Sequence, residues 1–332
     1  MSYDVAALKR ALDRFTEQRT ERELARAKTV RELNERYPRL AEIEGEISSC
    51  GLMIVENVMK GGDAVEENVM RIKARVRALR DERAAILKQN GLPADIIDGR
   101  YACPLCGDTG YVGSEMCACL REIYRQEQYK ELSELFSLAD GRIEAFDETL
   151  YSAVKTESES VTPREYMQLV AAKCRKYALG FSTSSPNLLF CGESGSGKTF
   201  LMACIARSAV ERDASVVYRS AFALAKLFED ERFSKTGEAE DALARCVKCD
   251  LLLIDNLGTE MTTAYTNSAL YQLINQRIAE KHPTLISTAM NTDEIAARYG
   301  PHMSARLRAD FVLLPVYPRA DGQSRGRNIL EI

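Results

Sequence analysis

The segment from Leu188 to Ala206 constrains the fold more than any other, because it joins an apolar strand, a glycine-rich loop and an amphipathic helix. The loop reads Gly-Glu-Ser-Gly-Ser-Gly-Lys-Thr and matches the pattern G-x-x-x-x-G-K-[ST] of phosphate-binding loops. Its glycines let backbone N–H groups converge on phosphate oxygens, and the following helix adds the positive end of its dipole. An ordinary glycine-rich turn is the alternative, and the strand before and the helix after the loop argue against it. The chain is predicted to bind a nucleoside triphosphate.

Particular roles follow for the residues of this loop. Lys198 is expected to reach the β- and γ-phosphates, and the Thr199 hydroxyl is expected to coordinate Mg²⁺. The residues expected to bind the nucleotide are Gly192, Glu193, Ser194, Gly195, Ser196, Gly197, Lys198, Thr199 and Phe200. A second magnesium ligand is expected at Asp255, which ends the apolar run Leu251–Ile254, because a carboxylate in that position holds the ion directly or through water.

Helical patterns alternate with short apolar runs from residue 164 onward. The runs are Leu188–Cys191, Val216–Tyr218, Leu251–Ile254, Thr284–Ser287 and Phe311–Pro315. Such alternation is typical of a parallel sheet with helices on both faces. The fold class is therefore α/β, a phosphate-loop core with a five-stranded parallel sheet, and ligands of such sheets bind beyond the carboxyl ends of the strands.

Length and composition limit the number of domains and the class of protein. A chain of 332 residues suggests about two domains, and 45% apolar with 28% charged residues is ordinary for a globular protein. No apolar run approaches the length of a membrane span, and the first residues lack a secretory signal, so a cytoplasmic location is expected. The net charge of −4 gives no overall basic footprint for nucleic acid, while local basic surfaces stay open.

Residues 1–98 are dense in charge and in helix-forming residues, with breaks expected at Pro38, Gly51 and Gly61–Gly62. Apolar residues recur every three or four positions in the first and third segments. In the first segment they are Val5, Leu8, Leu12 and Phe15, and in the third they are Val65, Val69, Ile72, Val76, Leu79 and Ile86. Arg83 occupies the position of this repeat between Leu79 and Ile86. This spacing predicts antiparallel helices that pair through one apolar stripe. The helices form a self-contained bundle, dock on another protein through a surplus apolar edge, or do both.

Residues 99–125 contain two close cysteine pairs, Cys103 with Cys106 and Cys117 with Cys119. Thiolates suit tetrahedral Zn²⁺, and Gly107 permits the tight turn after the first pair. A cytosolic chain rarely uses such pairs as disulfides, which favours a structural zinc knuckle whose folding depends on the metal. The second pair is C-x-C, closer than the usual C-x-x-C, and four unliganded thiols are the alternative.

With these motifs, the chain resembles the AAA+ ATPases of the bacterial replicative-helicase loader family, the DnaC/DnaI type. It also resembles their transposase-assisting relatives, the IstB type. Several motifs carry the resemblance. They are the C-P-x-C-x-D-T-G-Y run at 103–111, the loop Gly192–Thr199, the run at 253–260, Ile286-Ser287-Thr288, and Arg298-Tyr299-Gly300 leading to Ser304-Ala305-Arg306-Leu307. The knuckle upstream of an AAA+ core is similar to the DnaI-type loaders.

The resemblance implies a separate function for each domain of the chain. It implies that an N-terminal helical domain, residues 1–98, contacts the replicative helicase, and that the AAA+ domain, residues 164–332, binds ATP and single-stranded DNA. Residues 126–163 are expected as a linker region between the knuckle and this domain. By the same match Arg306 is the arginine finger that reaches a neighbouring subunit's nucleotide, with Arg308 as the alternative, so a homo-oligomer is implied.

Two departures from the family pattern fall on the hydrolytic apparatus. The residue after Asp255 is Asn256, where the family usually has an acid that polarises the attacking water. The sensor asparagine expected after Ser287-Thr288 is Ala289, with Asn291 two residues beyond. An amide orients water but does not take its proton as a carboxylate does. We therefore expect ATP binding with slow or partner-dependent hydrolysis, with Glu260 as a substitute acid.

Three functions remain open from the sequence. The first is loading of the replicative helicase on single-stranded DNA, the second is an IstB-like ATPase that assists a transposase, and the third is a nucleotide-switched adaptor that touches no DNA. The knuckle and the helical leader favour the first. Arg325 and Arg327 near the C-terminus are candidates for a phosphate or DNA contact, with a solvated tail as the alternative.

Overall fold

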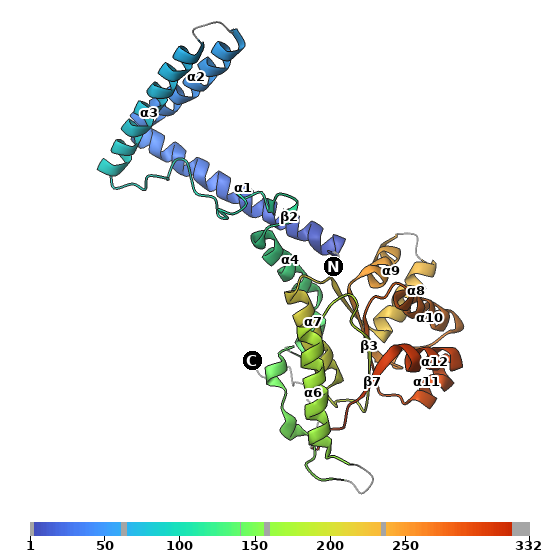
Figure 1. Cartoon of the computed structure of the whole chain (residues 1–332). Helices are drawn as coiled ribbons and strands as arrows, with labels where there is room; N and C mark the ends of the chain where they lie inside the picture. Colours follow the sequence, from blue (N-terminus) through green and yellow to red (C-terminus); the bar gives the residue numbers. More distant parts are fainter. Residues whose placement is uncertain (1–2, 61–64, 140, 156–159, 234–236, 321–332) are drawn as a thin grey trace. The chain divides into compact units, whose positions relative to one another are not determined.

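The computed structural model describes residues 3–60, 65–139, 141–155, 160–233 and 237–320, and divides into two compact units. One unit joins residues 1–11 to 121–332, and the other is residues 12–120. Two helices pass from one unit into the other, α1 (Val5–Arg36) and α4 (Ala118–Glu131) (Figure 1). Among the described residues, no helix is both long enough and apolar enough to cross a membrane.

The larger unit is built on a five-stranded parallel sheet. Its strands are β3 (Asn187–Cys191), β4 (Val216–Ser220), β5 (Leu251–Leu257), β6 (Thr284–Thr288) and β7 (Phe311–Pro315). Their order is β4-β5-β6-β3-β7, so β3, which leads into the phosphate loop, lies between β6 and β7. All five predicted strands are confirmed, and β7 has the predicted bounds. The α/β phosphate-loop fold is confirmed with them.

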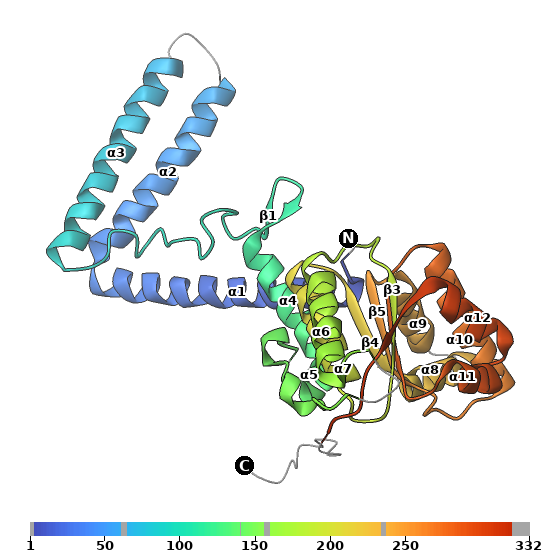
Figure 2. The same ribbon diagram turned by 60° about the horizontal axis from the view of Figure 1, so that its bottom comes forward.

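Helices cover both faces of this sheet. They are α5 (Ser133–Leu138), α6 (Pro163–Leu179), α7 (Lys198–Glu211), α8 (Ala221–Phe233), α9 (Glu238–Lys248), α10 (Ala264–Ala279), α11 (Thr292–Tyr299) and α12 (Pro301–Asp310), with 3-10 turns η1 (Ile143–Ala145) and η2 (Glu148–Leu150). Figure 2 shows α6 and α7 on one face and α8 to α12 on the other.

Successive residues of a strand pack alternately into two separate hydrophobic cores, one on each face of the sheet. Leu188 and Phe190 of β3 pack in the core beneath α6 and α7, whereas Leu189 packs in the core beneath α8 to α12. Successive side chains of a strand point to opposite faces, so a strand covered on both sides must be apolar throughout. This requirement explains the continuous apolar runs that marked the strands in the sequence.

The segment between the knuckle and α6, expected as a linker over residues 126–163, contributes to the first of these cores. Leu132, Leu135 and Tyr151 are each at most 3% exposed and pack there with the side chains of α6 and α7. The sequence pattern hid this packing because the segment folds as short helices and turns without a long apolar period. Residues 156–159 of the expected linker region lie outside the described residues.

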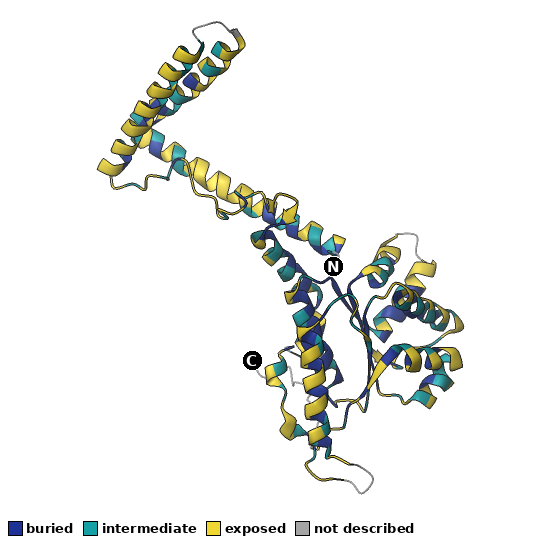
Figure 3. Ribbon diagram, viewed as in Figure 1, coloured by how far each residue is buried: buried dark blue, intermediate teal, exposed yellow. Residues whose placement is uncertain are grey.

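The smaller unit holds an antiparallel pair of helices, α2 (Pro38–Lys60) and α3 (Val65–Gln89), and a two-stranded hairpin, β1 (Tyr111–Val112) and β2 (Glu115–Met116). The predicted stripe of α3 is confirmed, since all its members are half-buried or buried. Arg83 forms ion pairs with Glu44 and Asp98, and Arg39 donates to Glu82 at 2.7 Å. The faces of α2 and α3 that point away from each other are largely exposed, as Figure 3 shows.

Two details of the helical prediction were wrong. Gly51 does not break a helix, because α2 runs through it, whereas the break at Pro38 is confirmed. Val5 is 79% exposed, and the buried stripe of α1 begins at Ala7 and Ala11 instead. Asp4 fixes this rotation, because its carboxylate accepts the Ala7 N–H at 2.8 Å and caps the helix. Gly61 and Gly62 lie outside the described residues.

Candidate functional site

The phosphate loop joins the carboxyl end of β3 to α7, and its glycines leave no room for side chains. A Cβ atom on Gly192 would lie 2.1 Å from the Val316 carbonyl oxygen, and one on Gly197 would lie 2.9 Å from the Tyr151 hydroxyl. Gly197 also has φ +108°, in the left-handed region that favours glycine. The backbone of the loop is therefore fixed by its surroundings and not by its own sequence alone.

Lys198 lies inside the loop at the first position of α7. Its ammonium donates to the carbonyl oxygens of Gly192 at 2.6 Å and Glu193 at 2.7 Å. Burial lowers the pKa of Lys198, although Asp255 nearby acts in the opposite direction. The ammonium group is thus held on the loop itself, at the place from which it reaches phosphate oxygens.

Asp255 at the end of β5 is fully buried and accepts several hydrogen bonds. The Thr199 hydroxyl donates to it at 3.0 Å, the Tyr218 hydroxyl at 3.1 Å, and the Ser287 hydroxyl also donates. The two expected magnesium ligands, Thr199 and Asp255, are therefore brought together. Tyr218 and Ser287 were not foreseen, although a polar residue within an otherwise apolar strand is a signal for each of them.

A cavity of about 460 Å³ opens over the loop, within the size range of small-molecule sites. One side of it is formed by loop residues, including Lys198 and Thr199, and by Asn256. The other side is largely apolar and comes from the segment before α6. Its residues are Leu138, Ala139, Ala145, Asp147 and Leu150. The cavity thus offers a polar end for phosphates and an apolar end for a flat ring.

Three aromatic residues link the segment before α6 to the region of the phosphate loop. Phe146 stacks on Tyr151 with ring centroids 5.9 Å apart and lies 6.5 Å from Phe200, which follows the phosphate loop. The Tyr151 hydroxyl donates to the Ser196 carbonyl at 2.8 Å. Tyr151 therefore ties the segment before α6 to the loop. Sequence reasoning missed it, because the two residues are 45 positions apart.

Arg319 also lines the cavity, and it was not among the predicted residues. Its Nε is buried without a hydrogen-bond partner in the part of the chain that the structure describes. The next residue is anchored, since the Ala320 N–H donates to the Leu150 carbonyl at 2.8 Å. Arg325 and Arg327 lie outside the described residues.

The residues considered for ATP hydrolysis make contacts that do not suit that role. Asn256 has φ +57° and lines the cavity, so an amide stands where an acid was expected. Asn291 caps α11, accepting the N–H groups of Asp293 and Glu294 at 2.9 Å each. Glu260 is buried and accepts the Gly258 N–H at 2.9 Å and the Tyr299 hydroxyl, and it does not line the cavity. Glu260 is therefore not in position to act as the substitute acid.

The finger candidate Arg306 lies on α12, outside the lining of this cavity. Its Nε donates to the Asn275 side chain at 2.7 Å, and its guanidinium pairs with Asp310 at 3.1 Å. The side chain is 41% exposed, and so it is accessible to another molecule. The alternative, Arg308, donates to Ser304 at 3.0 Å.

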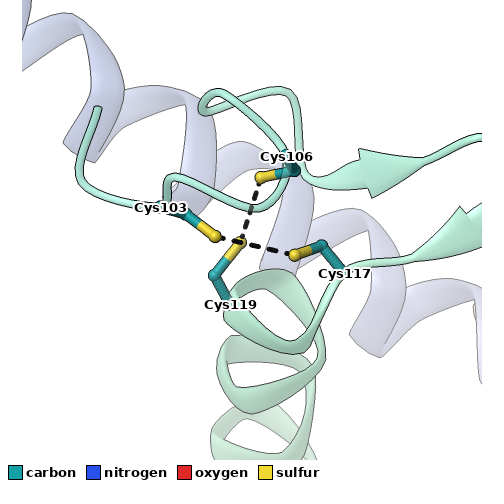
Figure 4. A group of neighbouring side chains, drawn as sticks. All are labelled: Cys103, Cys106, Cys117 and Cys119. Atoms are coloured by element: carbon teal, nitrogen blue, oxygen red, sulfur yellow. Dashed lines mark hydrogen bonds between the residues drawn. The ribbon is translucent and has the colours of Figure 1, made fainter. Parts of the chain in front are cut away.

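The four predicted zinc ligands form one cluster in the smaller unit (Figure 4). The Sγ atoms of Cys103 and Cys117 are 3.6 Å apart, those of Cys106 and Cys119 are 3.5 Å apart, and all four lie within 4.8 Å of one another. Zn–S bonds of about 2.3 Å in a tetrahedron place sulfur atoms about 3.8 Å apart. The donor set and its spacing fit a structural Zn²⁺ ion.

Other residues of the knuckle motif hold its turns. Asp108 accepts the Cys103 N–H at 2.8 Å and the Ala102 N–H at 3.0 Å, and the Cys117 N–H donates to the Gly110 carbonyl at 2.8 Å. A Cβ atom on Gly110 would lie 3.1 Å from Leu120, at a φ of +80°. The motif thus encodes the backbone around the thiols as well as the thiols themselves.

Comparison with known proteins bears on the nucleotide-binding region. Residues 154–306 match the family described as IstB-like ATP binding protein. The replicative helicase loader DnaC of Escherichia coli (strain K12) is 28% identical over 138 residues, which cover 41% of this chain and 56% of DnaC. DnaC of Shigella flexneri matches to the same extent. The chain therefore spans little more than half the length of these curated relatives.

Solved structures of DnaC, DnaI and DnaA also align with this chain. They include the crystal structure of the DnaC helicase loader (TM-score 0.43, 16% identity, 54% of this chain and 98% of that one) and that of DnaI (0.42, 17%, 55% and 90%). AMPPCP-bound DnaA from Aquifex aeolicus aligns at a TM-score of 0.42 and 17% identity, over 53% of this chain and 50% of that one. The family match and the curated relatives together confirm the resemblance to the helicase-loader and IstB-like ATPases, and the family match includes the phosphate loop, Asp255 and Asn256.

Proposed function

We propose that this protein is an ATP-switched loader of a replicative DNA helicase, which binds the helicase through its N-terminal helices and single-stranded DNA through its AAA+ module. The observation that carries the proposal is the similarity to the helicase loader DnaC, together with a family match over residues 154–306 that includes the phosphate loop and Asp255. A nucleotide bound there changes how the module fits its neighbours, and this change is the switch.

In this proposal the triphosphate of ATP lies on the loop Gly192–Thr199. Lys198 contacts the β- and γ-phosphates, Thr199 and Asp255 hold Mg²⁺, and Phe200 supports the apolar end of the cavity where the adenine ring lies. Arg319 enters the same cavity and contacts a phosphate or the ribose. The Tyr218 and Ser287 hydroxyl groups orient the Asp255 carboxylate toward the ion.

The end of the α2–α3 hairpin supplies the surface for the helicase. Six large apolar side chains are more than half exposed there. They are Leu52, Met53, Val55, Val58 and Met59 of α2 and Met70 of α3. Exposed apolar side chains gathered in one place mark contact surfaces, and methionines adapt well to a partner. We call these six residues the hairpin tip and assign the helicase contact to it.

Hydrolysis is slow in this proposal, because Asn256 and Ala289 stand where an acid and a sensor amide are expected. Arg306 acts as an arginine finger on the nucleotide of a neighbouring copy, so AAA+ modules assemble into a homo-oligomer. Binding and release of the helicase then depend on ATP occupancy and on assembly more than on rapid turnover. The four cysteines hold Zn²⁺ as a structural ion next to the helicase-binding helices.

The proposal is tested by capture of the purified replicative helicase on the full-length chain with MgATP. The variants Val58→Asp and Met59→Asp are expected to abolish capture, because each places a charge in the hairpin tip. Lys73→Glu on α3, an exposed polar position of the same hairpin, is the matched control and retains capture. Equal capture by all four proteins would contradict the assignment of the helicase contact.

Two other functions have a supporting observation each. The family match to IstB-like proteins favours a transposase-assisting ATPase, which predicts assembly on DNA without any helicase. The missing carboxylate at Asn256 favours an adaptor in which ATP sets conformation and no DNA is touched. Retention on single-stranded DNA only in the presence of ATP, together with helicase capture, separates the loader from both.

A further inference from the structure

A hydrogen-bonded contact joins the loop after β5 to the end of α11. The Tyr299 hydroxyl donates to the Glu260 carboxylate, whose other oxygen accepts the Gly258 N–H at 2.9 Å, and the Arg298 guanidinium donates to the Glu260 carbonyl. Glu260 is only 4% exposed. Burial and the Glu260 carboxylate raise the pKa of Tyr299 well above its usual value, so the tyrosine stays a neutral donor. We call this the Glu260–Tyr299 contact.

One side of the contact leads directly to the nucleotide. Glu260 lies five residues after Asp255, and Asn256 between them has φ +57° while its N–H donates to the Asp255 carboxylate at 3.1 Å and to the Ser287 hydroxyl at 2.8 Å. The loop therefore begins at the magnesium ligand and has a fixed backbone conformation. This loop is the covalent path from Asp255 to Glu260.

The other side leads to the proposed arginine finger. Gly300, with φ +88°, separates Tyr299 from α12, and the Ser304 hydroxyl on α12 donates to the Thr292 carbonyl at the start of α11 at 3.0 Å. Ile295 of α11 and Leu307 of α12 are buried in the same core. The two helices thus form one packed block, and this block carries Arg306.

We propose that Glu260 and Tyr299 are positioning residues that couple the nucleotide state at Asp255 to the placement of Arg306 against the neighbouring subunit. This inference rests on the proposed role of Arg306 and adds the connection that controls it. Neither residue lines the nucleotide cavity, so each acts through the block of α11 and α12. A buried carboxylate is an expensive way to fasten a loop, since an apolar contact would stabilise the fold at least as well. The Arg298 Nε beside this contact is buried and has no hydrogen-bond partner among the described residues, so the polar groups here are not all paired in this arrangement.

The position of the contact predicts an effect in trans, which a mixing experiment measures. An intact chain supplies both a bound nucleotide and a finger, and an Arg306→Ala chain supplies a site but no finger. With the Arg306→Ala chain in about ten-fold excess and MgATP present, most hydrolysis takes place where an intact chain's finger meets the site of an Arg306→Ala neighbour. Tyr299→Phe, and separately Glu260→Gln, are then placed in either chain, and ATP affinity and melting temperature are recorded for every variant.

In the chain that supplies the finger, we expect each substitution to lower turnover of the mixture by about ten-fold, part of the roughly thousand-fold or more that an arginine finger contributes. In the chain that supplies the site, turnover stays within about two-fold of the parent mixture. Equal losses in both positions, or no loss in the first, would overturn the coupling, and the pair of variants covers the case in which one fails to fold. A parent mixture that does not hydrolyse ATP rejects the finger itself.

Discussion

At the scale of one residue, the proposed separation of ATP binding from hydrolysis depends on Asn256. Its φ of +57° is uncommon except for glycine, asparagine and aspartate, so the backbone permits an acid at this position. Lys198, Thr199 and Asp255, the groups proposed to hold the nucleotide, lie together at the phosphate loop. In the proposed function, the change from acid to amide affects the attacking water and not the affinity for ATP.

We predict that Asn256→Asp raises steady-state ATP turnover by at least about ten-fold, since a general base contributes about 10²- to 10⁴-fold in enzymes. The affinity for MgATP should change by no more than about three-fold, because phosphate and ion contacts are untouched. Asn256→Ala is the control and should not raise turnover. Unchanged turnover of a folded, ATP-binding Asn256→Asp protein would contradict this account of the slow hydrolysis.

Tyr151 carries a second prediction at the same scale. Tyr151→Phe removes the hydrogen bond to the Ser196 carbonyl and should weaken MgATP binding by about five- to ten-fold, as expected for a loss of about 1 kcal/mol. Tyr177→Phe makes the same chemical change at a hydroxyl that donates to the Pro186 carbonyl, outside the cavity lining. It should leave ATP affinity unchanged. Fluorescent-nucleotide titrations of the two variants compare them directly, and equal affinities would reject the role of Tyr151.

At the scale of elements, the strands and the phosphate loop were predictable and the remaining walls of the cavity were not. A strand buried on both faces must be continuously apolar, and the loop pattern is local, so both are readable from neighbouring residues. Tyr151, Arg319 and the Glu260–Tyr299 contact depend on residues that are distant in sequence and meet only in the folded chain. Asp108 lies between these cases, because its position is fixed by the motif but its hydrogen bonds are not evident from it.

The zinc knuckle gives the prediction at this scale. Cys106→Ser should reduce bound zinc from one ion per chain to well below half, as measured by elemental mass spectrometry, because three thiolates hold the ion less tightly than four. Cys50→Ser alters a buried thiol outside the cluster and should keep the metal. Residues 101–119 should lose protection from hydrogen exchange in the first variant only.

ATP affinity tests whether the knuckle acts independently of the nucleotide site. The phosphate loop belongs to the other compact unit, so removing zinc should leave MgATP binding within about two-fold of the parent protein. Loss of both zinc and ATP binding in Cys106→Ser would show that the two sites depend on each other. Equal zinc content in Cys106→Ser and the parent would reject the cluster as a metal site.

On the scale of the whole molecule, one chain joins three parts that each need a different partner. The hairpin tip presents apolar side chains, the cavity accepts a nucleotide, and Arg306 is exposed on a helix block outside its own cavity. The helices α1 and α4 each have residues in both compact units, so the unit with the proposed helicase contact and the unit with the cavity are joined by two continuous helices. Nucleotide occupancy is therefore the variable on which the proposed loading depends.

The most direct measurement is an isothermal titration of MgATP into the full-length protein, with Lys198→Ala as the comparison. The account predicts uptake of one nucleotide per chain by the parent protein. It predicts an affinity at least about 100-fold lower for Lys198→Ala, equivalent to about 2.7 kcal/mol, because the variant loses a buried charge–phosphate contact. A folded parent protein that takes up no ATP, or a Lys198→Ala variant that binds it equally well, would contradict the account.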